Sequence, residues 1–320
     1  MALAFRLWFF IMERWEYSCA LSNNENHMRR SAHNRVIILL FMLACLDGIV
    51  WSFVFTSYTA GGKFALYFFD VGQGDSEFIT LPGDVQVLID GGPPNEMVLT
   101  ELSRILPAYD RYIDVVVMTH AQLDHFGGLL DVLKNYRVGM FVWNGRKGGT
   151  QSSEEIPRVL AETGTPSIVL QAGDSVTYNG YVFSILFPSA TYLKAAEANE
   201  SGFVALLRTP EGLKALYTAD VGSKTEALLV KQYGERMQAH VLKVGHHGSR
   251  FSTSDTFLGA VQPQVAAIEV GEGNRYGHPT QETLARLAVL GVRMFRTDEN
   301  GTITVALRDG ILRVQTVSRQ

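Results

Sequence analysis

The residues best suited to chemistry lie in one short stretch, Thr119–Gly128, which reads THAQLDHFGG. It holds two imidazoles, His120 and His125, and the carboxylate of Asp124. Neutral imidazole and carboxylate are ligands that suit Zn²⁺, Mn²⁺ or Fe²⁺. The stretch therefore predicts a divalent metal site. The same residues would also be explained by a helix N-cap at Asp124 beside two structural histidines.

Two apolar segments must position this stretch. The β-branched run at residues 113–118 precedes it and predicts a buried strand. Leucines recur at helical spacing in residues 126–136, just after it, and predict a helix. The metal-ligating residue types therefore fall on the turn at the carboxyl end of a strand, which is where open α/β sheets usually place their ligands.

Acidic or histidine-bearing turns also follow other predicted strands, at Asp70, Asp90, Asp220 and His246. Two facing sheets with helices outside them would gather all these strand ends on one edge. The glycine-bearing turn at 72–74 lacks the lysine of a phosphate-binding Walker loop.

Composition sets limits on the function. The chain has 320 residues, of which 47% are hydrophobic and 19% charged, as in a globular protein. Its formal charge of −4 provides no overall attraction to nucleic acid, so a polyanion would need a local basic patch or a metal. The two cysteines, Cys19 and Cys45, lie near the N-terminus, which leaves the remaining chain without disulfides or thiolate ligands.

An apolar segment at residues 36–55 is long enough for one bilayer crossing. Three arginines precede it, and the positive-inside rule then places the N-terminus in the cytoplasm. We therefore expect a cytoplasmic, unstructured segment at 1–35, a transmembrane signal-anchor at 36–55, and an extracytoplasmic domain at 62–320. A cleaved signal peptide or a buried core helix is the alternative for the apolar segment.

Six ordered motifs in residues 64–308 resemble the metallo-β-lactamase fold, an α+β fold built as an αββα sandwich. The version they resemble is the C-terminal hydrolase-like domain of the DNA-internalisation competence protein and its stand-alone relatives. The motifs are FDVGQGDS (69–76), LIDGG (88–92), THAQLDHFGG (119–128), YTAD (217–220), VLKVGHHGS (241–249) and NRYGHP (274–279).

The resemblance implies two metal positions, with Zn²⁺ or Mn²⁺ as the ions. His120, Gln122 and Asp220 would serve the first position. Asp124, His125, Asp220 and a late histidine would serve the second. The superfamily motif is His-x-His-x-Asp-His and the competence group resembles His-x-Asp-x-Asp-His, so Gln122 matches neither. Because an amide oxygen is a weak neutral ligand, we expect a weak first position.

Further roles follow from the same resemblance. His246 is assigned as the late metal ligand, although the sequence leaves the choice between it and His247 open. Asp124, His247 and His278 are expected to be catalytic. Asp70, Asp75 and Asp90 are expected to orient the metal-binding imidazoles. Lys243, Ser249, Arg250 and Arg275 are expected to bind a phosphate group of the substrate.

The expected function is a membrane-anchored, metal-dependent phosphodiesterase or nuclease, related to competence DNA uptake. A bound divalent ion lowers the pKa of water to roughly 7 and polarises the electrophilic oxygen. One alternative is a metal-depleted, non-catalytic module that binds DNA or acts as a scaffold. The other is a hydrolase of the same superfamily acting on a lactone, thioester or β-lactam.

Overall fold

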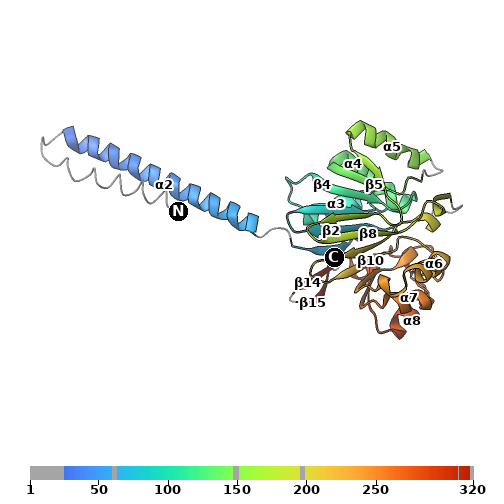
Figure 1. Ribbon diagram of the computed structural model, residues 1–320. Helices are drawn as coiled ribbons and strands as arrows, with labels where there is room; N and C mark the ends of the chain where they lie inside the picture. The colour runs from blue at the N-terminus through green and yellow to red at the C-terminus, as the bar shows by residue number, and fades with distance from the viewer. Residues whose placement is uncertain (1–24, 60–62, 147–150, 195–198, 309, 318–320) are drawn as a thin grey trace. The chain divides into compact units, whose positions relative to one another are not determined.

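The computed structural model describes residues 25–59, 63–146, 151–194, 199–308 and 310–317. The chain divides into two units, Met1–Gly61 and Gly62–Gln320, and each is described here by itself (Figure 1).

The N-terminal unit contains one long helix, α2 (Glu25–Thr59). Its segment Asn34–Ser52 is long and apolar enough to cross a membrane, and none of that segment is buried in the structure. A signal sequence near an N-terminus would have the same properties. The helix begins earlier than expected, because residues 25–35 are helical and not unstructured. Residues 1–24, also expected to lack structure, lie outside the described residues.

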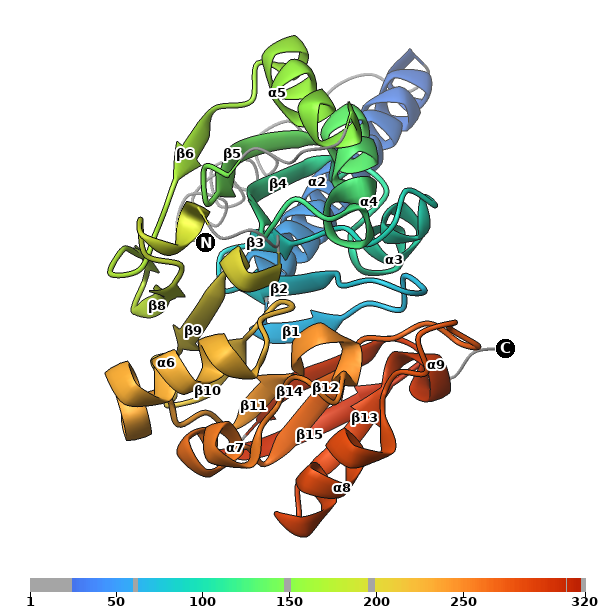
Figure 2. The ribbon, with the colours of Figure 1, turned by 90° about the vertical axis from the view of Figure 1, so that its right-hand side faces the viewer.

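The second unit is built on two facing β-sheets (Figures 1 and 2). The strand order of the first sheet is β15-β14-β1-β2-β3-β4-β5-β6, and that of the second is β13-β12-β11-β10-β9-β8-β7. The first sheet comprises β1 (Ala65–Phe68), β2 (Glu77–Leu81), β3 (Val85–Ile89), β4 (Tyr112–Met118), β5 (Arg137–Trp143), β6 (Ser167–Val169), β14 (Ile303–Arg308) and β15 (Ile311–Thr316). The second comprises β7 (Ser175–Tyr178), β8 (Tyr181–Phe187), β9 (Val204–Arg208), β10 (Lys214–Tyr217), β11 (Val241–Lys243), β12 (Val265–Ile268) and β13 (Arg293–Arg296).

Helices cover the outer face of each sheet (Figure 1). The first sheet carries α3 (Met97–Ile105), α4 (Leu123–Asn135) and α5 (Gln151–Thr163), and the second carries α6 (Ser223–Tyr233), α7 (Asp255–Val261) and α8 (Gln281–Val289). A short helix, α9 (Thr297–Asn300), follows β13. The 3-10 turns are Tyr192–Lys194, Asn199–Ser201, Gly234–Met237 and Gly245–Gly248.

Three apolar clusters hold these four layers together. Successive side chains of β4 point to opposite faces of the sheet, so this strand contributes to two of the clusters. Val116 packs toward the helices, whereas Val115 and Val117 point between the sheets. Burying a side chain such as Phe68 or Phe126, both at most 1% exposed, contributes ~1.5–3 kcal/mol. The expected αββα sandwich is therefore confirmed.

Parallel strands explain why the site lies on one edge. In the first sheet β3, β4, β5 and β6 run parallel, and in the second β10, β11, β12 and β13 do. The turns that follow β3, β4, β10 and β11 carry Asp90, His120, Asp220 and His246. Carboxyl ends of parallel strands meet at the same edge, as the sequence analysis expects for these turns.

Candidate metal centre

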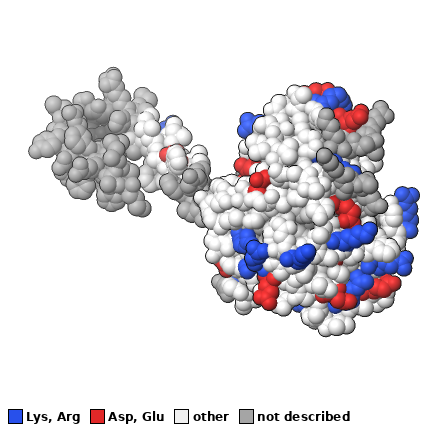
Figure 3. Space-filling model, turned by 45° about the vertical axis from the view of Figure 1, so that its right-hand side comes forward, with Lys and Arg blue, Asp and Glu red and all other residues white. Residues whose placement is uncertain are grey.

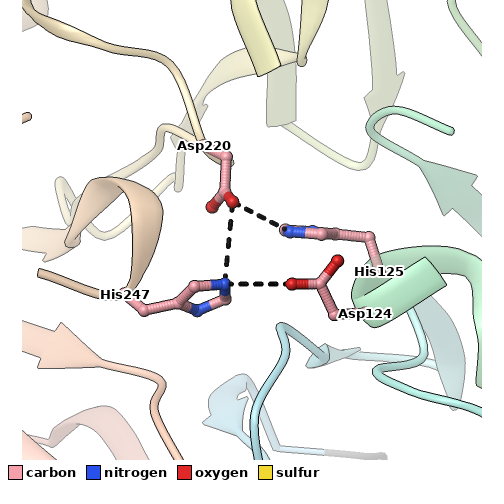
Figure 4. A group of neighbouring side chains, drawn as sticks. All are labelled: Asp124, His125, Asp220 and His247. Atoms are coloured by element: carbon pink, nitrogen blue, oxygen red, sulfur yellow. Dashed lines mark ion pairs between the residues drawn. The ribbon is translucent and has the colours of Figure 1, made fainter. Parts of the chain in front are cut away.

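Four side chains from three turns converge on one point (Figure 4). Asp124 and His125 lie in the first turn of α4, Asp220 lies between β10 and α6, and His247 lies in the turn Gly245–Gly248. The Oδ2 atom of Asp220 is 3.3 Å from Nε2 of His125 and 3.6 Å from Nε2 of His247. Nε2 of His247 is also 3.5 Å from Oδ2 of Asp124.

This geometry fits a divalent ion. Two ligands held ~2.1 Å from a tetrahedral ion are ~3.4 Å apart, close to the separations found here. The Nε2 atoms of His125 and His247 and both carboxylate oxygens of Asp220 are buried and have no hydrogen-bond partner among the described residues. An unsatisfied buried polar group costs ~1–3 kcal/mol. A coordinated cation would satisfy all four atoms at once.

The hydrogen bonds behind the two imidazoles fix their orientation. Nδ1 of His125 is 2.8 Å from the carboxylate of Asp90, and Nδ1 of His247 is 2.9 Å from the carbonyl oxygen of Glu269. Asp75 Oδ1 lies 3.1 Å from the same nitrogen of His247. Because these oxygens accept hydrogen bonds, the Nδ1 atom of each ring carries a proton, and a metal ion would be bound by the Nε2 atom, which faces the cluster. Asp75 and Asp90 thus occupy the positions expected of orienting carboxylates.

His120 belongs to the same network through Thr119. The Thr119 hydroxyl lies 2.5 Å from Asp90 Oδ2, to which it donates, and 3.0 Å from Nδ1 of His120. The single hydroxyl proton goes to the carboxylate, so Nδ1 of His120 is the donor to Thr119. The Nε2 atom of His120 lies 3.2 Å from Oε1 of the Gln122 side-chain amide. Nearby, the buried amide oxygen of Asn199 has no partner among the described residues. Apart from the shared carboxylate of Asp220, the first metal position is therefore served by one imidazole and by neutral amide groups.

Opposite charges perturb the acid–base behaviour of the cluster. Burial opposes protonation of His125 and His247, yet the carboxylates of Asp220 and Asp75 raise the pKa of His247 to about 10 and that of His125 well above its usual value. Burial alone would raise the pKa of both Asp124 and Asp220. The close contact with His247 and the charge of His125 instead lower the pKa of Asp124 to about 2, and the two imidazoles lower that of Asp220 well below its usual value.

His120 has the opposite shift. Burial and the neighbouring charge of His125 lower the pKa of His120 to about 4. Its ring is therefore neutral at pH 7 and offers a lone pair. The cluster thus concentrates carboxylate charge around the second metal position, and the first position has much less of it.

His247, and not His246 as expected, lies in the metal cluster. His247 is 3% exposed and joins Asp124 and Asp220, whereas His246 has a 34% exposed side chain and reaches only within 4.0 Å of Asp220. Both residues have left-handed backbones, with φ of 51° and 53°, which is costly for non-glycine residues. This conformation turns consecutive side chains in different directions, and sequence alone does not encode which one points inward.

Two residues expected to hold a phosphate are buried. Lys243 is 0% exposed, and its ammonium is paired with Asp75 and lies 3.9 Å from Asp220 Oδ1. Ser249 is 2% exposed. The expectation of substrate contact is wrong for both. Lys243 lies on β11, which runs through the core, and it neutralises carboxylates internally, whereas Ser249 is buried directly after the turn Gly245–Gly248. Arg250 and Arg275 are exposed, and their guanidinium groups lie over the rings of Phe251 and Tyr276.

Asp70 lies away from the cluster. Because β1 pairs with β14, the turn after β1 meets Thr302, whose hydroxyl accepts a hydrogen bond from the Asp70 backbone N–H at 3.0 Å. Asp70 lines a separate cavity with Glu101 and Arg104. Its expected role in orienting an imidazole is therefore wrong.

A cavity of about 620 Å³ opens over the cluster. Asp124, Asp220 and His247 line it, and His246, Arg275, Tyr276 and His278 form another part of its wall. The ring of His278 stacks at 6.0 Å on that of Tyr276. Burial and the nearby charge of His246 lower the pKa of His278 to about 4, so the ring is neutral at pH 7.

Sequence reasoning missed two buried carboxylates, Glu77 and Glu269, which lie behind the cluster with Asp75. Glu269 Oε1 accepts a hydrogen bond from the Ser76 backbone N–H at 2.9 Å. Burial raises the pKa of Glu77 well above its usual value, and burial with the charge of Asp75 raises that of Glu269 to about 8. The available signal was a carboxylate at the end of each apolar strand, since charged residues are rarely fully buried unless paired.

Comparisons with solved structures define the class of protein. The metallo-β-lactamase fold protein YhfI from Bacillus subtilis matches 79% of this chain and all of its own, with a TM-score of 0.51 and 13% identity. A metallo hydrolase from the archaeon Ignicoccus hospitalis matches 76% of this chain and all of its own, with a TM-score of 0.51 and 16% identity. The chain therefore has the metallo-β-lactamase fold.

Sequence relatives are more specific. ComE operon protein 3 of Bacillus subtilis is 32% identical over 250 residues, which cover 73% of this chain and 32% of that protein. Competence protein ComA of Neisseria gonorrhoeae is 30% identical over 256 residues, which cover 78% of this chain and 33% of that protein. The chain is thus a homologue of competence proteins and spans about a third of the length of these relatives. No protein-family model matches it.

Proposed function

We propose that this chain is a membrane-anchored, extracytoplasmic phosphodiesterase or nuclease that depends on a divalent metal ion and takes part in competence DNA uptake. The observation that carries the proposal is the set of buried, unpartnered atoms on His125, His247 and Asp220, which lie beside Asp124. The homology to competence proteins supports nucleic acid as the substrate.

Asp124, His125, Asp220 and His247 would hold the tightly bound ion. Bound there, a divalent ion such as Zn²⁺ or Mn²⁺ supplies a hydroxide nucleophile near neutral pH and polarises a phosphoryl oxygen. Asp75, Asp90 and the Glu269 carbonyl keep the two imidazoles aimed at it.

The cavity wall would orient the substrate. Arg275 carries a positive charge beside the cavity and would bind a phosphate oxygen. Tyr276 is 56% exposed between Arg275 and His278, and these three side chains would together contact a base or a phosphate of the substrate. His278 is neutral at pH 7, so its ring can exchange a hydrogen bond with an oxygen of the substrate. His246, at the cavity mouth, would contact the substrate and not the tight metal position.

The surface offers little long-range attraction to DNA. Lysine and arginine are interspersed with aspartate and glutamate on the face of the domain seen in Figure 3, and the net charge is −4. Substrate affinity would therefore come from contacts in the cavity and from the metal. We further propose that α2 spans the membrane as an uncleaved anchor, with the N-terminus in the cytoplasm.

A non-catalytic binding or scaffold module is a second candidate, and Gln122 is the observation that favours it. The amide lies 3.2 Å from Nε2 of His120, at a position where related motifs have an imidazole or a carboxylate. If hydrolysis requires two ions, this depletion leaves a protein that binds one ion and one nucleic acid strand without cleaving it.

Metal content and cleavage, measured together on the full-length chain in lipid nanodiscs, test the proposal. After dialysis we expect about one tightly held ion per chain by elemental analysis, and cleavage of a labelled DNA oligonucleotide that depends on added Mn²⁺ or Zn²⁺. Asp124→Ala should lose that ion. Gln122→Ala, two residues away and outside the tight position, is the matched control and should keep it.

The outcomes separate the candidates. Equal metal loss in both variants, or no metal in the parent chain, contradicts the assigned metal position. Tight metal binding without cleavage under any metal condition, combined with retained DNA binding, supports the non-catalytic module.

A further inference from the structure

A second cavity, of about 330 Å³, opens between the two sheets. Apart from Asp114, Thr177 and two tyrosines, its lining side chains are aliphatic or phenylalanine. Its walls come from the inner faces of β2 to β5 on one side and of β7 to β9 on the other. The volume lies within the ~300–1,000 Å³ range of ligand pockets.

Most polar groups on its wall already have partners. The Tyr178 hydroxyl donates to the carbonyl of Pro82 at 3.1 Å, and the Tyr181 hydroxyl donates to Glu211 at 3.0 Å. Asp114 accepts a hydrogen bond from the Gln86 backbone N–H at 2.9 Å. A polar ligand would therefore lose its hydrogen bonds to water and find few replacements in this cavity. A hydrocarbon chain has no hydrogen bonds to lose.

The cavity reaches the surface at an open edge of the sandwich. β6 and β7 are the last strands of their sheets on this side, and residues 170–174 connect them. Val176 on β7, which lines the cavity, is 42% exposed, whereas Ile185 and Leu207 farther inside are each 2% exposed. The result is a slot with an apolar rim and a buried apolar interior, which suits a long linear chain.

The place where the polypeptide enters this unit indicates the source of such a chain. The Phe64 ring packs 5.5 Å from the ring of Tyr181, which lines the slot, and the Lys63 carbonyl accepts a hydrogen bond from Thr80 at 2.9 Å. The candidate membrane span ends at Ser52. The chain from Ser52 to Lys63 reaches at most roughly 40 Å even when fully extended. A bilayer crossed by that span would therefore hold this unit on a short tether, and its phospholipids are the nearest source of long hydrocarbon chains.

We propose that this slot holds the acyl chain of a membrane phospholipid. The inference rests on the proposed membrane anchorage and goes beyond it: the lipid gives the domain a second attachment to the bilayer, at the end of the sandwich opposite the metal centre. β2 runs from Glu77, behind the metal cluster, to Leu81 on the slot, so the two sites lie at opposite ends of one strand.

Photolabelling from inside the bilayer tests this inference. The full-length chain is reconstituted in phosphatidylcholine nanodiscs that contain a phospholipid with a diazirine on its acyl chain, and adducts are mapped by mass spectrometry. We expect adducts along α2 and on the slot walls, in residues 79–87, 115–117 and 176–185. Val115→Phe should fill the slot, and Val176→Glu should place a charge on its rim, so both should lose the slot adducts.

Val289→Phe is the matched control, because Val289 is 86% exposed on α8 and does not line the slot. It should keep both sets of adducts. Adducts on α2 alone in the parent chain overturn the lipid site and leave the anchorage intact. Adducts on neither segment overturn the anchorage as well. Slot adducts that persist in both Val115→Phe and Val176→Glu also overturn the proposal. Metal content, measured on the same samples, tests the proposed metal site independently of the lipid site.

Discussion

At the scale of single residues, we propose that Gln122 determines how many ions the site holds. It lies beside His120 at the first metal position, where neutral amides replace the charged or imidazole ligands of related motifs. Divalent ions bind carboxylate and imidazole more strongly than a neutral amide oxygen. On this proposal, one side chain separates a one-ion site from a two-ion site.

Replacing Gln122 should therefore change the metal stoichiometry. Gln122→Asp restores the competence-type pattern and Gln122→His the general superfamily pattern, so either variant should raise the number of bound ions from about one towards two. Elemental analysis after dialysis measures this, with Gln122→Ala as the control that stays near one. If a second ion limits hydrolysis, phosphodiester cleavage should rise in parallel. A parent chain that already carries two ions would show that other groups complete the first position.

Burial changes the role inferred for Lys243 from binding a phosphate to neutralising buried carboxylates. Its ammonium is fully buried between Asp75 and the Ala219 carbonyl, 3.2 Å away. Burial disfavours its charge, but the carboxylates of Asp75 and Asp220 raise the pKa of Lys243 above its usual value, so the group stays charged. Its positive charge therefore stabilises the buried carboxylates of Asp75 and Asp220.

Lys243→Met should destabilise the fold by ~3–5 kcal/mol, because it leaves the Asp75 carboxylate buried without its partner. Adding Asp75→Asn should recover part of that loss, since the uncompensated charge is then absent. Urea denaturation of the detergent-solubilised chain measures both values. Unchanged stability with a raised KM for DNA would instead support the substrate contact that the sequence suggests.

At the scale of elements, the close approach of α4 to the turn after β3 holds the metal centre together. The Gly128 N–H donates to the Gly92 carbonyl at 3.0 Å, and the Gly91 N–H donates to the His125 carbonyl at 2.7 Å. A Cβ atom on Gly128 would overlap the carbonyl oxygen of Gly91. The glycines let the helix start sit directly against the turn that carries Asp90.

Gly128→Ala should therefore cost ~1–3 kcal/mol of stability, the usual range for overpacking. It should also weaken metal binding, because the helix carrying His125 must move away from Asp90. Gly259→Ala is the matched control: a Cβ atom on this exposed helical glycine would meet no atom of the described residues within 4 Å. Alanine there should be neutral or stabilising by up to ~1 kcal/mol. Thermal unfolding and metal titration of both variants test this, and equal effects would refute the packing argument.

At the scale of the whole molecule, the proposed membrane span would determine on which side of a membrane the candidate metal centre lies. Arginines precede the span Asn34–Ser52, and Lys63 is the nearest cation after it. By the positive-inside rule, we propose that the domain lies outside the cytoplasm.

A topology reporter fused after Gln320 tests that placement. A reporter that is active only in oxidising surroundings, such as alkaline phosphatase, should be active, and one that is active only in the cytoplasm should not. The same fusions with the three arginines replaced by glutamate are the control, since they should reduce or invert the preference. Cytoplasmic activity of the unaltered fusion would contradict the proposed location.

The sequence by itself determined the elements and the main motif. Period-two and period-3.6 patterns are local, so the strand before His120 and the helix after it could be predicted, and they appear as β4 and α4. The order of strand-end turns predicted that these turns would gather on one edge, and the resemblance to the metallo-β-lactamase fold implied the sandwich and the ligand set of Asp124, His125 and Asp220.

Only the tertiary structure decided which side chains face inward at that edge. His247 and not His246 joins the cluster because two consecutive left-handed residues turn the chain, and this depends on packing against the neighbouring strands. Lys243 is buried because β11 is an inner strand of its sheet, and Asp70 is excluded because β1 pairs with β14. The apolar slot arises from residues on strands far apart in sequence. Such contacts follow from how the sheets face each other, and no local pattern encodes them.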